Sequence, residues 1–352
     1  MDLENAERFK EIDREDMYGH IHTLPEQLAK AWEMGQKMPL PESDGLSAVV
    51  ITGMGGSAIG AELVAAYVAP LASVPVAVVR EYDLPGWVRG PGVLVIASSH
   101  SGNTEETISA FHQAKERGCR LMTLTTGGKL NQLAVEVGAP AWIFDHKGQP
   151  RAAVGYSFGL MLSILTRLGI IPDPAVALKD TVTAMRAQQA SLARECAVYL
   201  NPAKRMAGQL YGRWVMVMGS DYLAPVARRW KGQVNEIAKA WAQYDVLPEA
   251  DHNTLSGIFN PEDLLAKMAA LFLRSSSDHP RNRLRAELTR RTMMVQGIAT
   301  DMIEASGDNP MAHMWTALHY GDYMAYYLAM LYEVDPSPIT AMVELKKTLS
   351  SM

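Results

Sequence analysis

The chain has 352 residues, 48% hydrophobic and 20% charged, which is enough for two ordinary domains with separate cores. Its 33 lysines and arginines against 38 aspartates and glutamates leave a net charge of −5. Runs of like charge are short, so we expect neither nucleic acid nor a membrane as a partner. Two cysteines, Cys119 and Cys196, form no metal-binding or redox motif, which is typical of a cytoplasmic protein. The expected partner is therefore a small molecule.

The first 45 residues predict a helical lead-in. Apolar residues recur with helical spacing at Ile21, Leu24, Leu28 and Trp32, and prolines follow them. The segment 1–14 is rich in charge and lacks the apolar centre of a signal peptide. No stretch of the chain is apolar enough to predict a transmembrane helix.

Residues 46–170 predict an α/β domain with a doubly wound, mainly parallel sheet. Short apolar, β-branched runs predict strands at 48–52, 75–80, 92–98, 120–125 and 141–144. Helical patterns lie at 58–68, 104–117, 130–137 and 156–168. Continuously apolar strands separated by helices indicate a sheet covered on both faces.

The remaining chain predicts a helical connection and a second lobe. Residues 171–204 form the connection, with a long polar helix over 176–196. For the second domain, residues 205–352, we expect strands at 213–219 and 271–274 and helices at 223–244, 310–331 and from Pro338 to Met352. Both halves place a Gly-Ser pattern after a strand, which predicts two similar α/β lobes.

The first candidate binding loop follows the strand over 48–52. Ligands of open parallel sheets lie at the carboxyl ends of strands. Gly55, Gly56 and Ser57 lie in the loop Gly-Met-Gly-Gly-Ser-Ala, whose open backbone N–H groups at a helix start suit a phosphate. The same loop also fits a tight turn without a ligand. A third reading is a dinucleotide fingerprint with Glu81 or Asp83 as the ribose partner.

The second candidate loop, Ser98–Thr104, holds four hydroxyl groups and a glycine directly before a helix. A helix N-cap would account for one of these hydroxyls. Several hydroxyl donors at a helix N-terminus satisfy a phosphate without a metal. Ser99, Ser101 and Thr104 are therefore candidate phosphate-binding residues, which a nicotinamide-dependent oxidoreductase would not need.

Together the two loops resemble the sugar isomerase domain, in which the second loop binds the phosphate of a phosphosugar. The stretches 228–239 and 249–253 are similar to the bifunctional phosphoglucose/phosphomannose isomerase family, and the resemblance covers about residues 18–347. It implies an aldose–ketose isomerase that interconverts fructose 6-phosphate with glucose 6-phosphate and mannose 6-phosphate through an enediolate. It also implies that the enzyme needs no metal and no cofactor.

Aldose–ketose isomerisation requires a base for proton transfer and a group that opens the sugar ring. By resemblance, Glu236 of the Asn-Glu motif transfers the proton, and His252 of the His-Asn motif opens the ring. On their own, Glu236 also suits a solvated helix face and His252 a polar turn. The resemblance assigns the cations near the enediolate to Arg151 and Lys346. Read alone, Arg151 also suits a surface loop, and Lys347 is an alternative to Lys346.

Two departures from the family pattern involve His100, where the family commonly has tyrosine, and the neighbours of His252. Ser337 and Thr340 are alternative candidates for the C-terminal hydroxyl that the family associates with mannose 6-phosphate. The histidines show no set of metal ligands with a suitable spacing.

The resemblance also implies a homodimer with shared active sites, to which the apolar helix over 311–331 would offer surface. A different class of function remains open. A non-catalytic phosphosugar sensor built on the same lobes would keep the loop Ser98–Thr104 for binding, while Glu236 and His252 would be structural.

Overall fold

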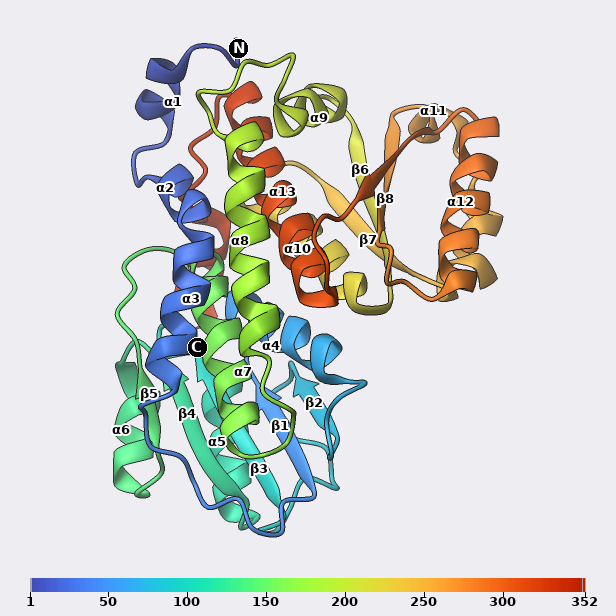
Figure 1. Cartoon of the computed structure of the whole chain (residues 1–352). Coiled ribbons are helices and arrows are strands. Elements are labelled where there is room, and N and C mark those ends of the chain that lie inside the picture. Colours follow the sequence, from blue (N-terminus) through green and yellow to red (C-terminus); the bar gives the residue numbers. More distant parts are fainter. Residues whose placement is uncertain (1, 350, 352) are drawn as a thin grey trace. The chain divides into compact units, whose positions relative to one another are not determined.

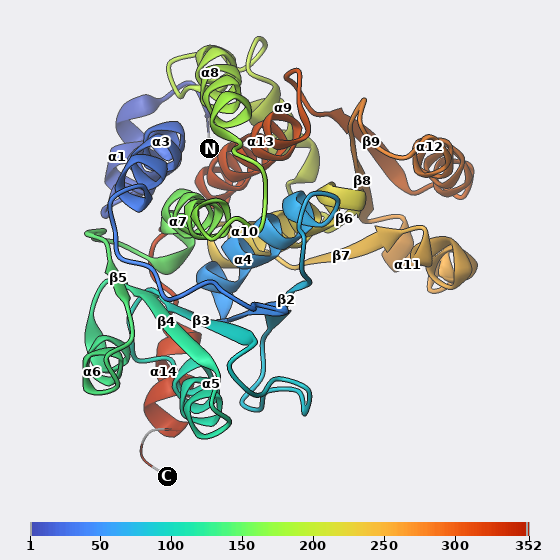
Figure 2. The same ribbon diagram turned by 60° about the horizontal axis from the view of Figure 1, so that its bottom comes forward.

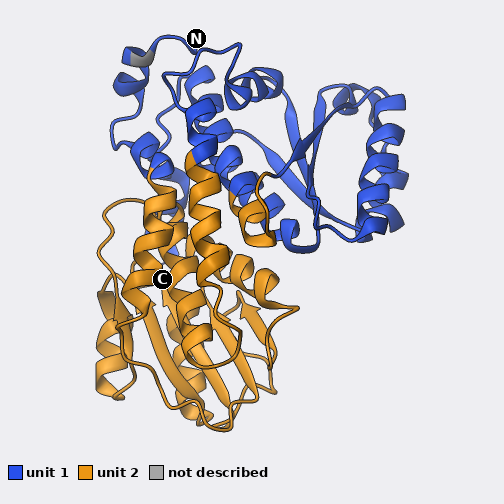
Figure 3. Ribbon diagram, viewed as in Figure 1, with its two compact units in different colours: residues 1–22, 187–305, 316–352 blue, residues 23–186, 306–315 orange. Residues whose placement is uncertain are grey.

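The computed structural model describes residues 2–349 and 351 and divides the chain into two compact units (Figure 3). Unit 1 comprises residues 1–22, 187–305 and 316–352, and unit 2 comprises residues 23–186 and 306–315. Each unit contains one parallel β-sheet flanked by helices (Figure 1). The prediction of two α/β lobes with parallel sheets is therefore confirmed.

The sheet of unit 2 has the strand order β2-β1-β3-β4-β5, and all neighbouring pairs are parallel. Its strands are β1 (Ala48–Thr52), β2 (Val76–Val79), β3 (Val93–Ser99), β4 (Arg120–Thr125) and β5 (Ala141–Ile143). Every residue of β1 and β3 is buried, as expected for central strands covered on both faces. The continuously apolar runs in the sequence predicted these strands correctly.

Helices cover both faces of this sheet (Figure 2). On one side lie α4 (Gly55–Val68) and α7 (Val154–Arg167), and α3 (Leu24–Gly35) packs on α7. On the other side lie α5 (Glu105–Glu116) and α6 (Gly128–Glu136). Helix α8 (Ala175–Leu192) contributes residues to both units. This architecture places the loops that follow β1 and β3 at the carboxyl edge of the sheet.

The sheet of unit 1 repeats the same order with four parallel strands, β7-β6-β8-β9. The strands are β6 (Trp214–Ser220), β7 (Ala242–Leu247), β8 (Met268–Arg274) and β9 (Ala299–Glu304). Helix α10 (Ala224–Glu236) contacts β6 and β7, and α12 (Pro280–Val295) contacts β8 and β9. The other helices are α1 (Ala6–Ile12), α2 (Met17–His22), α9 (Pro202–Leu210), α11 (Glu262–Leu265), α13 (Pro310–Leu331) and α14 (Thr340–Leu349).

Several predicted elements of this unit were wrong. The helix predicted over 223–244 ends at Glu236, and strand β7 begins at Ala242. Strands β7 and β9 lie at the edges of the sheet, so they keep partly exposed polar residues and lack a continuous apolar run. The polar helix predicted to residue 196 ends at Leu192. Met352, where the last predicted helix was to end, lies outside the described residues.

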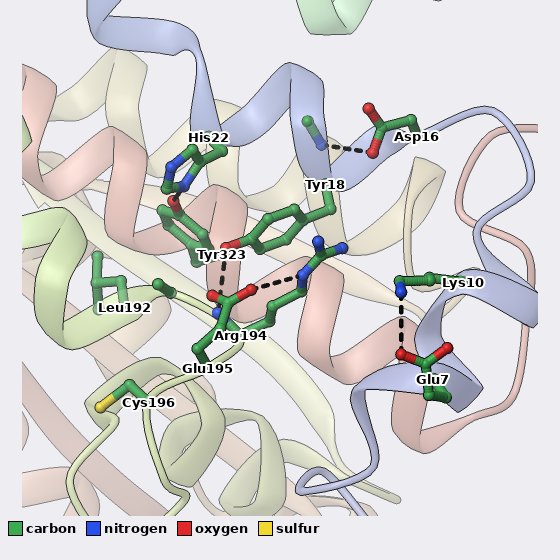
Figure 4. Close-up of polar contacts among 12 residues, drawn as sticks. Glu7, Lys10, Asp16, Tyr18, His22, Leu192, Arg194, Glu195, Cys196 and Tyr323 are labelled. Atoms are coloured by element: carbon green, nitrogen blue, oxygen red, sulfur yellow. Dashed lines mark hydrogen bonds and ion pairs between the residues drawn. The ribbon is translucent and has the colours of Figure 1, made fainter.

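The N-terminal helices α1 and α2 belong to unit 1, and Figure 4 shows polar contacts of α2 with α13 and with the segment after α8. The ring of His22 shares a hydrogen bond of 2.7 Å with the Tyr323 hydroxyl. The Tyr18 hydroxyl accepts the Arg194 backbone N–H at 3.1 Å, and the Arg194 guanidinium lies 4.5 Å from the centre of the Tyr18 ring. The segment 1–45 thus contains three helices, α1, α2 and α3, which end at Gly35.

The apolar residues of α13 are buried within the chain. The prediction that this helix offers apolar surface to a second subunit is therefore wrong, because its side chains already pack inside the molecule. Among residues 2–349 and 351, no helix is both long enough and apolar enough to span a bilayer.

Removal of the Asp322 charge is expected to destabilise unit 1. Arg229 on α10 donates to both carboxylate oxygens of Asp322 on α13, at 3.1 and 2.7 Å, and both side chains are buried. Asp322→Asn would remove the negative charge that faces the buried guanidinium, at a cost of about 3–5 kcal/mol. Urea denaturation measures this loss. The matched control is Glu11→Gln, which breaks the exposed pair with Arg8 and should leave stability nearly unchanged. Equal losses in the two variants would contradict the prediction.

Candidate active site

The first loop connects β1 to α4 in unit 2. Gly55, the first residue of α4, has a φ of +50°, which favours glycine, and a methyl group added there would meet no atom within 4 Å. At Gly56 the reason for glycine is different. A Cβ atom at Gly56 would lie 2.5 Å from the Pro150 carbonyl oxygen and 2.9 Å from the Arg151 nitrogen. There is therefore open space beside Gly55, whereas Gly56 packs closely against the backbone of Pro150 and Arg151.

The second loop connects β3 to α5. Thr104 occupies the N-cap position, but its side chain makes no capping hydrogen bond. Its hydroxyl instead lies 2.9 Å from that of Ser99, which also accepts the Gly102 N–H at 3.1 Å. Ser99 is buried and Ser101 is exposed. Because the N-cap side chain is not used for capping, the backbone N–H groups at the start of α5 remain available to an anion.

Ser57 joins the two loops. Its hydroxyl accepts the backbone N–H of His100 at 3.1 Å, and its side chain is buried. Arg151, in the 3-10 turn Pro150–Ala153, is 3% exposed and follows the carbonyl that Gly56 contacts. Unit 2 therefore brings together the predicted residues of both loops and the backbone of Arg151.

A pair of imidazoles forms one wall of the second loop. His100 Nε2 lies 3.0 Å from His146 Nδ1, so one ring donates and the other accepts. Phe144 and Tyr156, which stack on each other, pack edge-on against these rings. Burial lowers the pKa of His100, which favours the neutral form of its ring. His146 was not predicted to belong to the site, because 46 residues separate it from His100 and no local motif connects them.

The loop after β4 holds the second loop in place by hydrogen bonds and close backbone packing. The carbonyl of His100 accepts both the N–H and the hydroxyl of Thr126, at 3.0 and 2.7 Å. A Cβ atom at Gly102, whose φ is +68°, would lie 1.8 Å from the Gly127 carbonyl oxygen. This close approach fixes the backbone of the second loop and requires glycine at residue 102.

Glu236 is the last residue of α10 in unit 1 and is partly buried. Just beyond it, Lys239 has a φ of +55°, an unusual conformation for a lysine. The Lys239 ammonium donates to the Glu236 carbonyl oxygen at 2.5 Å and to the Pro336 carbonyl oxygen at 3.3 Å. Lys239 therefore fixes the helix end that carries Glu236, a role that the sequence did not reveal.

His252 ends a 3-10 turn after β7 and is exposed. Within residues 2–349 and 351, its ring has no hydrogen-bond partner. The preceding residue anchors the turn: Asp251 accepts Thr289 Oγ1 at 2.7 Å and Arg285 NH1 at 2.9 Å. Asp251 thus ties the turn that carries His252 to α12.

Unit 1 does not bring Glu236 and His252 together. Helix α10 leads from the carboxyl edge of β6 back to the amino edge of β7, so Glu236 lies near the amino edge. The six residues of β7 then carry the chain about 20 Å to the carboxyl edge, where His252 follows. The two residues therefore lie at opposite edges of the same sheet.

The C-terminal candidates differ in burial. Lys346 and Lys347 lie on α14, whose residues are all exposed. Ser337 is 1% exposed, whereas Thr340, at the start of α14, is exposed. Among residues 2–349 and 351, Lys346 forms no hydrogen bond or ion pair with another predicted site residue.

The fold and the paired loops define a protein of the sugar isomerase domain class. Two solved structures share this fold. A hypothetical protein from Thermus thermophilus is 17% identical, has a TM-score of 0.73, and matches over 95% of this chain and 89% of its own. Tagatose-6-phosphate ketose/aldose isomerase from Escherichia coli is 18% identical, has a TM-score of 0.64, and matches over 91% of this chain and 94% of its own.

More similar sequences identify the family. Residues 200–349 match the bacterial phospho-glucose isomerase C-terminal SIS domain. The bifunctional phosphoglucose/phosphomannose isomerase of Caldicellulosiruptor bescii is 36% identical over 96% of this chain and 99% of its own length. The enzyme of the same name from Aquifex aeolicus is 34% identical over 86% of this chain and 90% of its own. The chain belongs to the bifunctional phosphoglucose/phosphomannose isomerase family, and the prediction of an isomerase is confirmed.

Proposed function

We propose that the protein interconverts fructose 6-phosphate with glucose 6-phosphate and mannose 6-phosphate by ring opening and proton transfer through an enediolate. The observation that carries this proposal is the second loop of unit 2. There, the hydroxyl groups of Ser99 and Thr104 lie 2.9 Å apart. The Thr104 side chain does not cap α5, so it leaves the backbone N–H groups at the helix N-terminus available. Such a set of donors suits a phosphate monoester.

In the proposed mechanism, Ser57, Ser99, Ser101 and Thr104 hold the phosphate, with Gly55 and Gly56 giving it access to the backbone. Glu236 moves the proton between carbon 1 and carbon 2 of the open-chain sugar. Arg151 and Lys346 stabilise the negative charge that develops on the enediolate oxygens. The arginine next to the phosphate loops supports a site that needs neither a metal nor a cofactor for this charge.

We also propose that the active protein is a homodimer in which His252 opens the sugar ring in the partner subunit's site. The exposure of His252 and its separation from Glu236 by the length of β7 support this arrangement. A dimer of shared sites would supply the acid–base group that Glu236 lacks in its own sheet. The cytoplasm remains our proposed location, in keeping with the free thiols of Cys119 and Cys196.

The test is turnover of fructose 6-phosphate by purified, chelator-treated protein. Coupled assays follow glucose 6-phosphate and mannose 6-phosphate separately, and we expect both products. Glucose 6-phosphate alone would contradict the mannose 6-phosphate activity and the assignment of Ser337 or Thr340 to it. Binding of fructose 6-phosphate without any turnover would favour the sensor, which the named relatives do not support.

A further inference from the structure

The two sheets are related position by position. In unit 2, Thr52 of β1 pairs with Ala97 of β3, and in unit 1, Met218 of β6 pairs with Phe272 of β8. A glycine follows each of these paired residues, Gly53 directly after the end of β1 and Gly219 next to Met218 within β6. Helix α5 begins eight residues after Ala97, and α12 begins eight residues after Phe272. The loops after β3 and β8 therefore have equal lengths.

This alignment pairs Gly55 with Asp221, each two residues after its glycine. The backbone conformations agree, because φ is +50° at Gly55 and +48° at Asp221. An aspartate at positive φ is uncommon, whereas a glycine there costs nothing sterically. The segment after β6 in unit 1 thus has the backbone conformation of Gly55 but carries a carboxylate.

The same alignment pairs Asn103 with Asp278 in the loops that precede α5 and α12. Asp278 is 5% exposed, and its Oδ2 accepts the backbone N–H of Ser275 at 2.7 Å. Asp221 accepts the backbone N–H of His279, the N-cap of α12, at 3.1 Å and the side-chain amide of Asn282 at 3.1 Å. The carboxylates of Asp221 and Asp278 therefore accept hydrogen bonds from groups around the start of α12.

In unit 2 the corresponding positions carry no charge. Gly55 has no side chain, and the neutral Asn103 amide oxygen accepts the Lys129 N–H at 3.0 Å. A phosphate in the loop of unit 1 would meet both carboxylates, which repel it and already hold donors that it would need. Burial raises the pKa of Asp278 to about 6, with a smaller contribution from the charge of Asp221, so Asp278 is mainly ionised at pH 7.5.

We infer that Asp221 and Asp278 are specificity-determining residues that act as internal anions in unit 1 and so restrict phosphosugar binding to the loop of unit 2. The inference rests on the proposed function, since it takes the loop Ser98–Thr104 as the phosphate site. It predicts that a chain with two similar lobes binds one substrate molecule.

The test is the number of fructose 6-phosphate molecules bound per chain at pH 7.5, measured by equilibrium dialysis with labelled sugar. The wild-type protein should bind one, and Asp221→Gly combined with Asp278→Asn should bind two. Adding Ser99→Ala and Thr104→Val to each background removes the site of unit 2. Binding should then be lost in the first background and fall to one molecule in the second.

The matched control is Asp16→Gly, which also replaces an aspartate at positive φ, here +54°, in the same unit. It should leave the number of bound molecules at one. Near-ultraviolet circular dichroism checks the fold of each variant, and the isosteric single variant Asp278→Asn serves if the double variant unfolds, with partial occupancy of a second site expected.

Two bound molecules in the wild-type protein would overturn the inference. So would a folded double variant that still binds one, or, if only Asp278→Asn folds, a single variant whose binding equals that of the wild type. No binding by the wild-type protein would instead contradict the proposed phosphate site.

Discussion

Replacement of Glu236 by glutamine is expected to abolish isomerisation while leaving phosphosugar binding intact. Glutamine keeps the shape of the side chain but cannot accept the proton that moves between carbon 1 and carbon 2. Loss of a general base lowers the rate by about 100- to 10,000-fold. Because the phosphate loops lie on other elements, the dissociation constant for fructose 6-phosphate should change little.

Two measurements separate chemistry from binding in this variant. Uptake of deuterium from solvent into the product reports the proton transfer, and calorimetric titration reports binding. Glu136→Gln is the matched control, because Glu136 is also the last residue of its helix, α6, and is exposed. It should keep wild-type activity. If Glu236→Gln turned over fructose 6-phosphate at the wild-type rate, another residue would have to be the base.

The sequence predicts the sheet of unit 2 more completely than that of unit 1, for a physical reason. The strands β1 and β3 are buried on both faces and therefore appear as continuous apolar runs. Strands β7 and β9 are edge strands that keep Tyr244, Asp245 and Asp301 partly exposed. Helix α12 buries only Ala286, Thr289 and Met293. A narrow buried stripe in an arginine-rich helix gives a weak periodic signal.

The candidate site likewise contains residues that the sequence predicts and residues that only the structure reveals. The loop residues are close in sequence, and each glycine and serine there has a local chemical reason, so local patterns are enough to find them. Three further residues contribute through tertiary contacts or an unusual backbone conformation, which no local sequence motif indicates. They are His146, Lys239 and Asp221. Their contacts depend on the pairing of strands and the end of α10, which one sequence read alone does not specify.

Gly56→Ala is expected to lower kcat/KM by about 100-fold through displacement of Arg151. The added Cβ would lie 2.5 Å from the Pro150 carbonyl oxygen and 2.9 Å from the Arg151 nitrogen. Both atoms belong to the backbone, so the 3-10 turn Pro150–Ala153 must move to relieve the overlap. A shift of about 1 Å in a positioned group costs about 100-fold in rate. Steady-state kinetics with fructose 6-phosphate measure the loss, which should include a fall in kcat.

Gly60→Ala separates this displacement from a general loss of stability. It adds a methyl group one turn further along α4, where the Cβ would lie 2.5 Å from that of Ser157 on α7. Both variants force α4 away from a neighbour, so both should lower the melting temperature. Only Gly56→Ala presses on the backbone that carries Arg151, so only this variant should lose activity per folded molecule. Equal activity losses in the two variants would mean that packing of α4, and not the position of Arg151, controls the rate.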